Sequence, residues 1–322
     1  MRVAIYGAGQ LGSGVARLLR ERGGVEVAGP YGREARAAAL CGGADVVLIA
    51  TTSFLADVAE DVRTAVEHGS NVVTSAEEAA CPWVVDAALA DELDALARER
   101  GVTILGAGLN PGLAFDAIVV TALGGVARAD RIAVERVVDL SGFGPVVLRR
   151  LGIGFAPGAF AAGVRDGTIF GHIGFPQSMQ TVARRTGVTI ERIERELEPL
   201  LAGAALRAGE LEVAPGESAG FNQRYTAIVE GAPWFEARFT GHIDLATEGL
   251  APRDAIELSG PTPLRLTIEP GIDPQQGSTA VLANSLRRLV EAPAGWLTVA
   301  HLPPAAPDCA SDLSRSAPPA RR

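Results

Sequence analysis

The sequence predicts an α/β protein, in which a Rossmann-type parallel sheet is joined to a second, α+β domain. Three observations favour this fold class. An apolar run at residues 2–6 leads into a glycine turn and an amphipathic helix. Apolar runs then alternate with helical patterns up to residue 128, as in parallel sheets. From residue 129 the pattern changes to successive short strands, which indicates a separate sheet.

The glycine turn after the first strand has the spacing of a dinucleotide site. Glycine at position 7 allows a sharp turn, Gly9 allows a pyrophosphate to approach the backbone, and Gly12 allows the helix to pack closely on the strand. The unpaired N–H groups at the helix N-terminus would hold the phosphates, although a βαβ turn without ligand remains the alternative. The predicted cofactor-binding residues here are Gly7, Gly9, Gln10, Leu11 and Gly12.

The end of the second strand, residues 25–29, bears on which dinucleotide binds. An NAD site usually places an acid there for the ribose hydroxyls, but this chain has Arg33, with Arg36 one turn later. Two guanidinium groups suit a 2′-phosphate, so we prefer NADP to NAD, although Glu34 could still reach a ribose. The next strand, residues 45–50, follows too soon for a full helix and a further strand. The adenine-side edge of the sheet is therefore expected to be shortened.

Hydroxyl side chains follow the strand at residues 45–50. Thr51, Thr52 and Ser53 lie where the strand should end, at the carboxyl edge of the sheet. Open α/β sheets bind their ligands at this edge, so the three hydroxyls are predicted to line the dinucleotide cleft. The alternative for Ser53 is a helix N-cap.

Two later strands bring carboxylate and amide side chains to the same edge. The strand at residues 71–75 precedes Glu77 and Glu78, and the strand at residues 102–105 leads to Asn110. Parallel strands end side by side, so these groups are expected near the glycine turn.

The composition excludes several classes of protein. The chain starts directly in a strand and has no run of the length of a membrane span, so we expect a cytoplasmic protein without a membrane partner. A net charge of -9 argues against a nucleic-acid partner. Cys41, Cys81 and Cys309 are too few and too scattered for a disulfide framework or a zinc site, and we predict no metal.

All 29 basic residues are arginines, because the chain contains no lysine. Arginine keeps its proton at physiological pH, so neither a Schiff base nor lysine acid–base catalysis is possible. Proton transfer must therefore use carboxylates, tyrosine, cysteine, histidine or water.

Residues 129–276 are predicted to form a substrate and dimerisation domain. Its expected strands cover residues 131–140, 210–213, 224–230, 234–244, 255–259 and 264–268, and its expected helices residues 159–165 and 188–206. The segment 277–302, with a helix at 278–290, should return to the dinucleotide-binding domain of residues 1–128. The Pro/Ala/Ser/Arg-rich residues 303–322 are expected to be a disordered tail.

Several motifs resemble those of the 2,4-diaminopentanoate dehydrogenases and the native amine dehydrogenases. The similar stretches are residues 7–14, 50–54, 76–82, 105–112, 139–145, 166–176 and 295–298. The glycine turn is generic, whereas the pair at 139–145 and 166–176 is specific. The resemblance spans nearly the whole chain, and its N-terminal part is distantly similar to dihydrodipicolinate reductase. That enzyme itself is excluded, since its proton-donating lysine has no counterpart here.

This resemblance implies NAD(P)-dependent oxidative deamination of an amine, or reductive amination of a carbonyl, by a homodimer. It also implies that the Ala-Glu-Glu stretch carries the catalytic carboxylate. Two features depart from the family: the segment after Arg33 is short, and Gly32 stands where an acid is often found. Both bear on cofactor affinity and preference.

The chemistry of an amine supports a catalytic carboxylate. Hydride leaves the carbon only after the nitrogen has lost its ammonium proton, whose pKa is about 10, and a cationic iminium forms. A carboxylate can serve as the base and also stabilise the cation. Glu78 and Glu77 are the candidates, with Glu78 preferred. The alternative is that one of them caps or flanks the helix near Pro82 in contact with solvent.

Four further residues are predicted to contact the substrate, each with a structural alternative. Arg149 could clamp a substrate carboxylate or form a surface ion pair. His172, in a glycine-rich loop, could meet the substrate or be a hydrogen-bonded core histidine. Asn110 could bind the carboxamide of the cofactor or the substrate nitrogen, or shape its turn. Phe143 could wall an apolar pocket for an alkyl amine, or serve in packing.

Two other functions compete with an amine dehydrogenase. An imine or carbonyl reductase would use the same cofactor without exchanging ammonia. A protein that binds the dinucleotide without turnover is less favoured, because a DNA-linked redox sensor would need a basic winged-helix module and none is visible.

Overall fold

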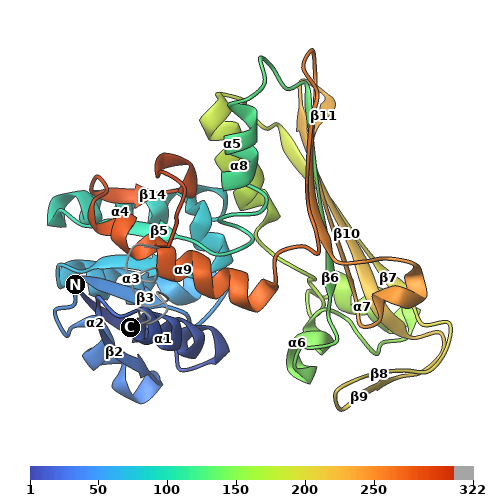
Figure 1. The fold of residues 1–322 in the computed structure, drawn as a ribbon, viewed down its shortest axis with the longest axis horizontal. Coiled ribbons are helices and arrows are strands. Elements are labelled where there is room, and N and C mark those ends of the chain that lie inside the picture. The colour runs from blue at the N-terminus through green and yellow to red at the C-terminus, as the bar shows by residue number, and fades with distance from the viewer. Residues whose placement is uncertain (308–322) are drawn as a thin grey trace, which may run out of the picture. The chain divides into compact units, whose positions relative to one another are not determined.

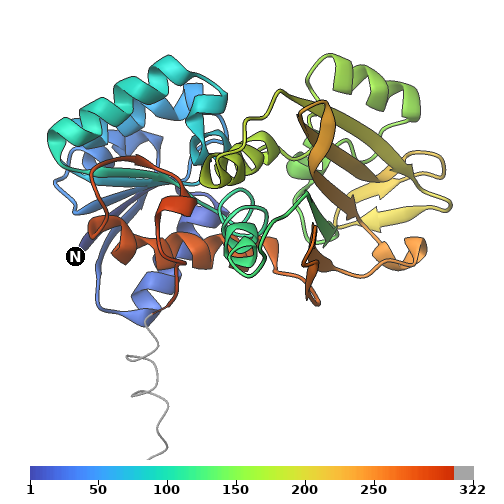
Figure 2. The same ribbon diagram turned by 90° about the horizontal axis from the view of Figure 1, so that it is seen from above.

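The computed structural model describes residues 1–307, and residues 308–322, which hold Cys309 and most of the expected tail, lie outside that description. The chain forms two compact units (Figures 1 and 2). Unit 1 combines Met1–Ala117 with residues 274–307, and unit 2 is Ile118–Asp273. The sequence placed these boundaries after residues 128 and 276. Among the described residues, no helix is both long and apolar enough to cross a membrane.

Unit 1 is built on a six-stranded parallel sheet in the order β14-β5-β4-β3-β1-β2. Its strands are β1 (Arg2–Tyr6), β2 (Glu26–Tyr31), β3 (Val46–Ile49), β4 (Asn71–Thr74), β5 (Thr103–Gly106) and β14 (Gly295–Leu297). The central strands are buried on both faces, which explains their continuous apolar runs. Strand β2 is the edge, with β1 as its neighbour. The expected shortening of the adenine side is therefore confirmed.

Helices cover both faces of this sheet (Figure 1). One apolar cluster joins the sheet to α1 (Gln10–Arg22) and α9 (Pro274–Val290). The other joins it to α2, α3 and α4. These helices span Arg36–Leu40, Leu55–Glu67 and Ala87–Arg100. Unit 1 also contains short 3-10 turns. Three of them follow strands β2, β4 and β14, and η3 precedes α4: η1 (Arg33–Ala35), η2 (Glu77–Ala80), η3 (Pro82–Val84) and η5 (Val299–His301).

Unit 2 is built on a six-stranded mixed sheet in the order β13-β12-β6-β11-β10-β7. Strands β6 and β11 run parallel, and the other neighbours are antiparallel. The strands are β6 (Arg131–Asp139), β7 (Arg192–Leu201), β10 (Ser218–Val229), β11 (Ala232–His242), β12 (Arg253–Ser259) and β13 (Leu264–Ile268), with a hairpin of β8 (Leu206–Ala208) and β9 (Leu211–Val213). The helical elements are α5 (Ala117–Leu123), α6 (Pro145–Arg150), α7 (Pro157–Arg165), α8 (Phe175–Thr186) and η4 (Leu245–Glu248). The predicted α/β fold with a second α+β unit is confirmed.

The predicted helix at residues 188–206 is wrong, because this segment contains strand β7. Its apolar residues Ile193, Leu197, Leu200 and Leu201 have the spacing of one helix face, which explains the prediction. Pairing with β10 along its whole length overrides that local pattern. Pro199 fits the strand, because β7 is the edge of its sheet.

Candidate active site

Four loops of unit 1 meet at the carboxyl edge of its parallel sheet. They follow β1, β3, β4 and β5, which are neighbours in the sheet. Backbone hydrogen bonds join the start of three of these loops to the end of the neighbouring strand: Ala50 N–H donates to Tyr6 (2.8 Å), Ser75 N–H to Ile49 (3.0 Å) and Ala107 N–H to Thr74 (2.9 Å). The predicted convergence of the polar loops therefore occurs within this unit.

The glycine turn fits a pyrophosphate. A Cβ on Gly7 would lie 2.3 Å from the carbonyl oxygen of Ala50, and one on Gly12 would lie 1.9 Å from that of Gly7. These two glycines are therefore required by the packing of strand, turn and helix. Gly9 is different, because a Cβ there would meet no atom of the chain within 4 Å. The open space over Gly9, where α1 begins with Gln10 and Leu11, is what a bound phosphate would use.

The two arginines after β2 are not equivalent. Arg36 donates from Nε to the carboxylate of Asp61, 2.5 Å away, and from its terminal nitrogen to the Thr64 hydroxyl. Its guanidinium is thus held against α3, and the hydrogen bond with Asp61 raises its pKa. Arg33 is exposed. The Glu34 carboxylate folds over Gly32, where a Cβ would lie 2.5 Å from one carboxylate oxygen.

The three hydroxyls after β3 also differ in role. Thr51 is exposed. The hydroxyl of Thr52 donates to Asp57 (3.1 Å) and accepts from the N–H of Phe54 (3.3 Å), so it closes the first turn of α3. Ser53 is not the N-cap of α3, since that position belongs to Phe54. Its hydroxyl is instead a hydrogen-bond partner of the Glu77 carboxylate.

The carboxylate of Glu78 accepts a hydrogen bond at the start of α3. Its carboxylate accepts from the N–H of Leu55, 2.7 Å away, and its own N–H donates to the carbonyl of Ser53 (3.2 Å). Phe54 at the N-cap has no side chain that could satisfy the first helical N–H groups. Glu78 supplies the acceptor and places its negative charge at the positive end of the helix.

Glu77 lies in a different environment from its neighbour. Burial raises the pKa of its carboxyl to about 7, and the charge of Glu78 adds to this effect. Hydrogen bonds from Ser53 and from its own backbone N–H oppose the rise. A carboxyl group with this pKa can take up or release a proton near neutral pH.

The turn η2, which carries Glu77, is held in place by strand β5 and by Trp296. A Cβ on Gly106, the last residue of β5, would lie 2.2 Å from the carbonyl carbon of Ala79, so the turn η2 packs directly on the strand. The indole of Trp296 donates to the carbonyl of Ala79 (3.1 Å). Trp296 comes from β14, which the sequence did not predict as a strand. The position of the carboxylate thus depends on a residue close to the end of the described chain.

Asn110 lies in the loop after β5 and is half-buried. The loop is fixed by Asp116, which is fully buried. One carboxylate oxygen of Asp116 accepts from the N–H of Gly112 (2.7 Å) and the other from that of Ala117 (2.9 Å). Sequence reasoning missed Asp116. The only sequence signal for it was the Asn-Pro-Gly turn at residues 110–112, which comes shortly before it.

The remaining predicted residues belong to unit 2. Arg149 is exposed in the last turn of the short helix α6. Phe143 is half-buried in the turn before that helix, where its N–H donates to the carbonyl of Leu140 (3.0 Å). His172 is half-buried in the loop before α8, with its ring stacked on Phe239. Within unit 2, therefore, Arg149 and Phe143 share one segment and His172 lies in another.

Comparison with known proteins places the chain among amine-acting enzymes. Residues 113–316 match the family described as the 2,4-diaminopentanoate dehydrogenase C-terminal domain. The 2,4-diaminopentanoate dehydrogenase of Acetoanaerobium sticklandii is 30% identical over 329 aligned residues, which cover 94% of this chain and 93% of that protein.

Solved structures agree with this relationship. The amine dehydrogenase from Mycobacterium smegmatis has a TM-score of 0.81 at 25% identity, covering 95% of this chain and 97% of that one. A probable dehydrogenase from Thermotoga maritima, at 12% identity, has a TM-score of 0.52 over 93% of this chain and 91% of its own, and so shares the fold. The predicted class of enzyme, an oxidoreductase that acts on amines, is confirmed. The chain belongs to the 2,4-diaminopentanoate dehydrogenase family.

Proposed function

We propose that this protein interconverts an amine with a carbonyl compound and ammonia, using a nicotinamide dinucleotide. The observation that carries this proposal is Glu77, a carboxyl group whose pKa burial raises to about 7. It follows β4 at the same sheet edge as the glycine turn after β1. An amine dehydrogenase needs a proton acceptor of this kind beside its dinucleotide.

In the oxidative direction, Glu77 would take the proton that the substrate ammonium must lose before oxidation. A dinucleotide held by the glycine turn of Gly7, Gly9 and Gly12 would supply the hydride acceptor for the substrate carbon. Once Glu77 has released this proton to water, its ionised carboxylate offsets the positive charge on the substrate nitrogen, an effect strengthened by its partly buried position. Ser53 orients the carboxylate and favours its charged form. Water adds to the resulting iminium and ammonia leaves, so that carbonyl, ammonia and reduced cofactor form in equal amounts.

We propose Glu77 rather than Glu78 as this base. The sequence favoured Glu78, but the carboxylate of Glu78 accepts from the N–H of Leu55 at the start of α3. Its carboxylate is thus already used as the acceptor for the first turn of a helix, which makes Glu78 a structural anchor.

For the cofactor we propose NADP, with Arg33 as the residue that contacts its 2′-phosphate. Arg33 is exposed after β2, whereas Arg36 is already paired with Asp61. Glu34, folded over Gly32, is the group that would favour the ribose hydroxyls of NAD. Because Arg33 favours NADP and Glu34 favours NAD, we expect a moderate preference for NADP, with NAD also accepted.

The substrate is proposed to be a short amine that unit 2 recognises. The relative from Acetoanaerobium sticklandii is named for 2,4-diaminopentanoate, which carries a carboxylate beside its amino groups. Arg149, exposed at the end of α6, would clamp such a carboxylate. We propose that His172 makes a polar contact with the substrate and that Phe143 makes an apolar one. Asn110 is proposed to bind the substrate nitrogen.

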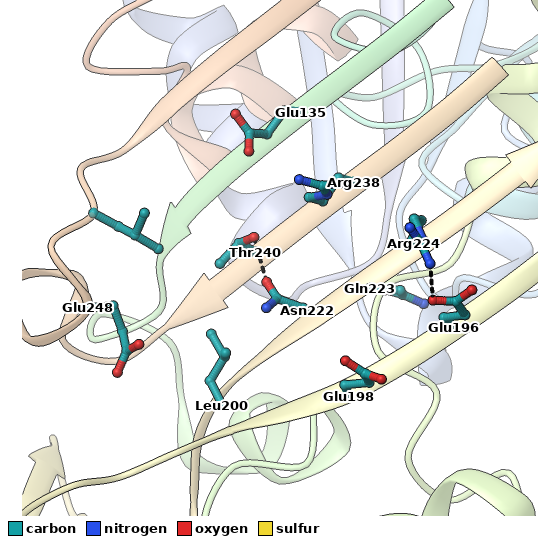
Figure 3. Close-up of a pocket in the computed structure, with 11 residues that line it drawn as sticks. Glu135, Glu196, Glu198, Leu200, Asn222, Gln223, Arg224, Arg238, Thr240 and Glu248 are labelled. Carbon is teal, nitrogen blue, oxygen red and sulfur yellow. Dashed lines mark hydrogen bonds and ion pairs between the residues drawn. The ribbon is translucent and has the colours of Figure 1, made fainter.

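We further propose a homodimer formed by the uncovered face of the unit 2 sheet. A row of side chains crosses this face in the order Glu135, Arg238, Arg224 and Glu196, on four neighbouring strands (Figure 3). Arg238 and Arg224 are neighbours in the middle of the row, where Arg224 pairs with Glu196, whereas Glu135 pairs with Arg253 outside the row. A two-fold axis could place the acidic ends of one copy over the central arginines of the other. Sedimentation of the double variant Arg224→Glu, Arg238→Glu as a monomer would support this interface, and an unchanged dimer would contradict it.

The experiment that tests the activity measures three products together. The protein is incubated with NADP⁺ or NAD⁺ and a panel of amines and diamino acids, and carbonyl, ammonia and reduced cofactor are quantified. Equal amounts of the three are expected, with turnover lost in Glu77→Gln. Cofactor oxidation by ketones or imines that does not depend on ammonia would instead indicate a reductase, and the absence of turnover with every amine would contradict the proposal.

A further inference from the structure

We propose that Gln223 is a positioning residue that sets the orientation of His172 for the substrate. This inference rests on the proposed function, because it gives His172 a role in binding the amine or carbonyl substrate. Gln223 lies in β10 and is fully buried. The two residues are 51 positions apart in the sequence and are joined by a hydrogen bond in unit 2.

The side-chain amide of Gln223 forms hydrogen bonds to the backbone on both sides of Gly171, the residue before His172. Its oxygen accepts from the backbone N–H of His172 (2.8 Å), and its nitrogen donates to the carbonyl of Phe170 (3.3 Å). This pairing defines the direction of the amide, because a flipped amide would place a donor against the N–H of His172. A buried amide that lost these partners would be destabilising, so the loop and the side chain hold each other in one arrangement.

Gly171 makes this close approach possible. Its φ of 64° lies in the left-handed region, and a Cβ would lie 2.7 Å from the amide oxygen of Gln223. The loop therefore passes over the amide without a side chain between them. The next residue, His172, must then leave the loop in a fixed direction.

Aromatic contacts orient the ring of His172. The imidazole stacks on Phe239, with ring centroids 5.2 Å apart, and meets Phe175 edge-on at 5.4 Å. Phe175 in turn stacks on Tyr225, which lies two residues after Gln223 on β10. Gln223 thus fixes the backbone of His172, and the aromatic neighbours fix its ring. Such an arrangement pre-organises a polar group for a ligand at little further cost in entropy.

The test combines kinetics with amide hydrogen exchange in the full-length protein. His172→Phe retains a stacking ring but loses the ring nitrogens. Gln223→Met retains the side-chain length but loses the amide. Each is expected to raise KM for the amine on the order of tenfold, with smaller effects on kcat and on KM for the cofactor, as for the loss of one substrate hydrogen bond.

Non-additivity distinguishes positioning from a general structural effect. The double variant should be no worse than His172→Phe alone, because Gln223 acts through His172. The backbone N–H of His172 should also lose its exchange protection in Gln223→Met. Fully additive losses in the double variant, or unchanged protection of that N–H, would overturn the proposal. If His172→Phe binds the amine as well as wild type does, the substrate role of His172 fails, and the proposal fails with it.

Two further variants cover the case in which Gln223→Met does not fold. Gln223→Glu keeps the acceptor for the N–H of His172, and is expected to retain part of the wild-type affinity for the amine. Gly171→Ala disturbs the same contact from the loop side, and should reproduce the raised KM. A Gly171→Ala variant with wild-type KM and wild-type exchange would contradict the proposal. If wild-type protein oxidises no amine at all, the proposed function fails, whereas hydrogen exchange still reports on the Gln223 contact.

Discussion

The carboxylate of Glu78 accepts a hydrogen bond from the backbone N–H of Leu55 over 2.7 Å and so closes the first turn of α3. Its neighbour Glu77 is half-buried, and desolvation of its carboxyl raises the pKa to about 7. Two adjacent residues with the same side chain therefore have different environments. This difference separates the structural carboxylate from the proposed catalytic one.

The first prediction concerns Glu78→Gln. The neutral amide can still accept from Leu55, but it loses the favourable interaction of a charge with the helix N-terminus, so we expect a stability loss of ~1 kcal/mol. Amine oxidation should remain within about tenfold of wild type, because no proton passes through this residue. Chemical denaturation and steady-state kinetics measure the two effects. A loss of activity without a loss of stability would instead assign Glu78 the catalytic role.

The second prediction concerns Glu77 and the pH dependence of stability. Between the ordinary carboxyl pKa and about 7, the folded protein holds a proton that the unfolded chain has released, so stability falls as pH rises through this window. Glu77→Gln removes this penalty. The variant should be about as stable as wild type at pH 5 and more stable at pH 8. The upper bound on this gain in unfolding free energy is ~3 kcal/mol, and because the side chain is only half-buried, solvent screening makes the gain smaller. Equal differences in unfolding free energy at both pH values would contradict a raised pKa.

The third prediction compares two glycines of the dinucleotide turn. Gly9→Ala places a Cβ in open space, so the melting temperature should not change, while the KM for the dinucleotide should rise on the order of tenfold or more because the methyl group occupies the phosphate position. Gly12→Ala is the matched control, since its Cβ would lie 1.9 Å from the carbonyl oxygen of Gly7 and must destabilise the protein. If Gly9→Ala binds the dinucleotide as tightly as wild type, the phosphate site is misplaced.

The fourth prediction concerns cofactor preference. Arg33→Ala should raise KM for NADP⁺ on the order of tenfold and leave KM for NAD⁺ nearly unchanged, because only the 2′-phosphate contacts this side chain. Arg36→Ala should instead lower stability, since its guanidinium is bound to Asp61. Kinetics with both cofactors, together with thermal melting, separate the two arginines. An equal effect of Arg33→Ala on both cofactors would argue against a 2′-phosphate contact.

Much of the dinucleotide-binding unit could be predicted from the sequence, because buried parallel strands give continuous apolar runs and the glycine turn has strict steric requirements. Strand β7 could not be predicted, since the spacing of Ile193, Leu197, Leu200 and Leu201 also fits a helix. Only the partner strand β10 decides between the two structures.

The roles of individual side chains depend on contacts that sequence order does not show. Arg36 meets Asp61, 25 positions later, and nothing in the sequence around either residue indicates this contact. The choice between Glu77 and Glu78 depends on which carboxylate meets the N–H of Leu55. Gln223 carried no motif of its own, and its importance follows only from its contact with His172.

The central claim, that Glu77 is the base, is tested most directly by the pH dependence of amine oxidation between pH 5 and 9, where a substrate amine of pKa about 10 stays largely protonated. In wild type, kcat/KM should rise with pH through an apparent pKa near 7. In Ser53→Ala this pKa should move upwards, because the hydrogen bond that favours the charged carboxylate is lost. In Glu77→Gln the inflection near pH 7 should disappear and the rate should fall by a factor on the order of 100 or more. A Glu77→Gln variant that keeps both the rise near pH 7 and the wild-type rate would contradict the account.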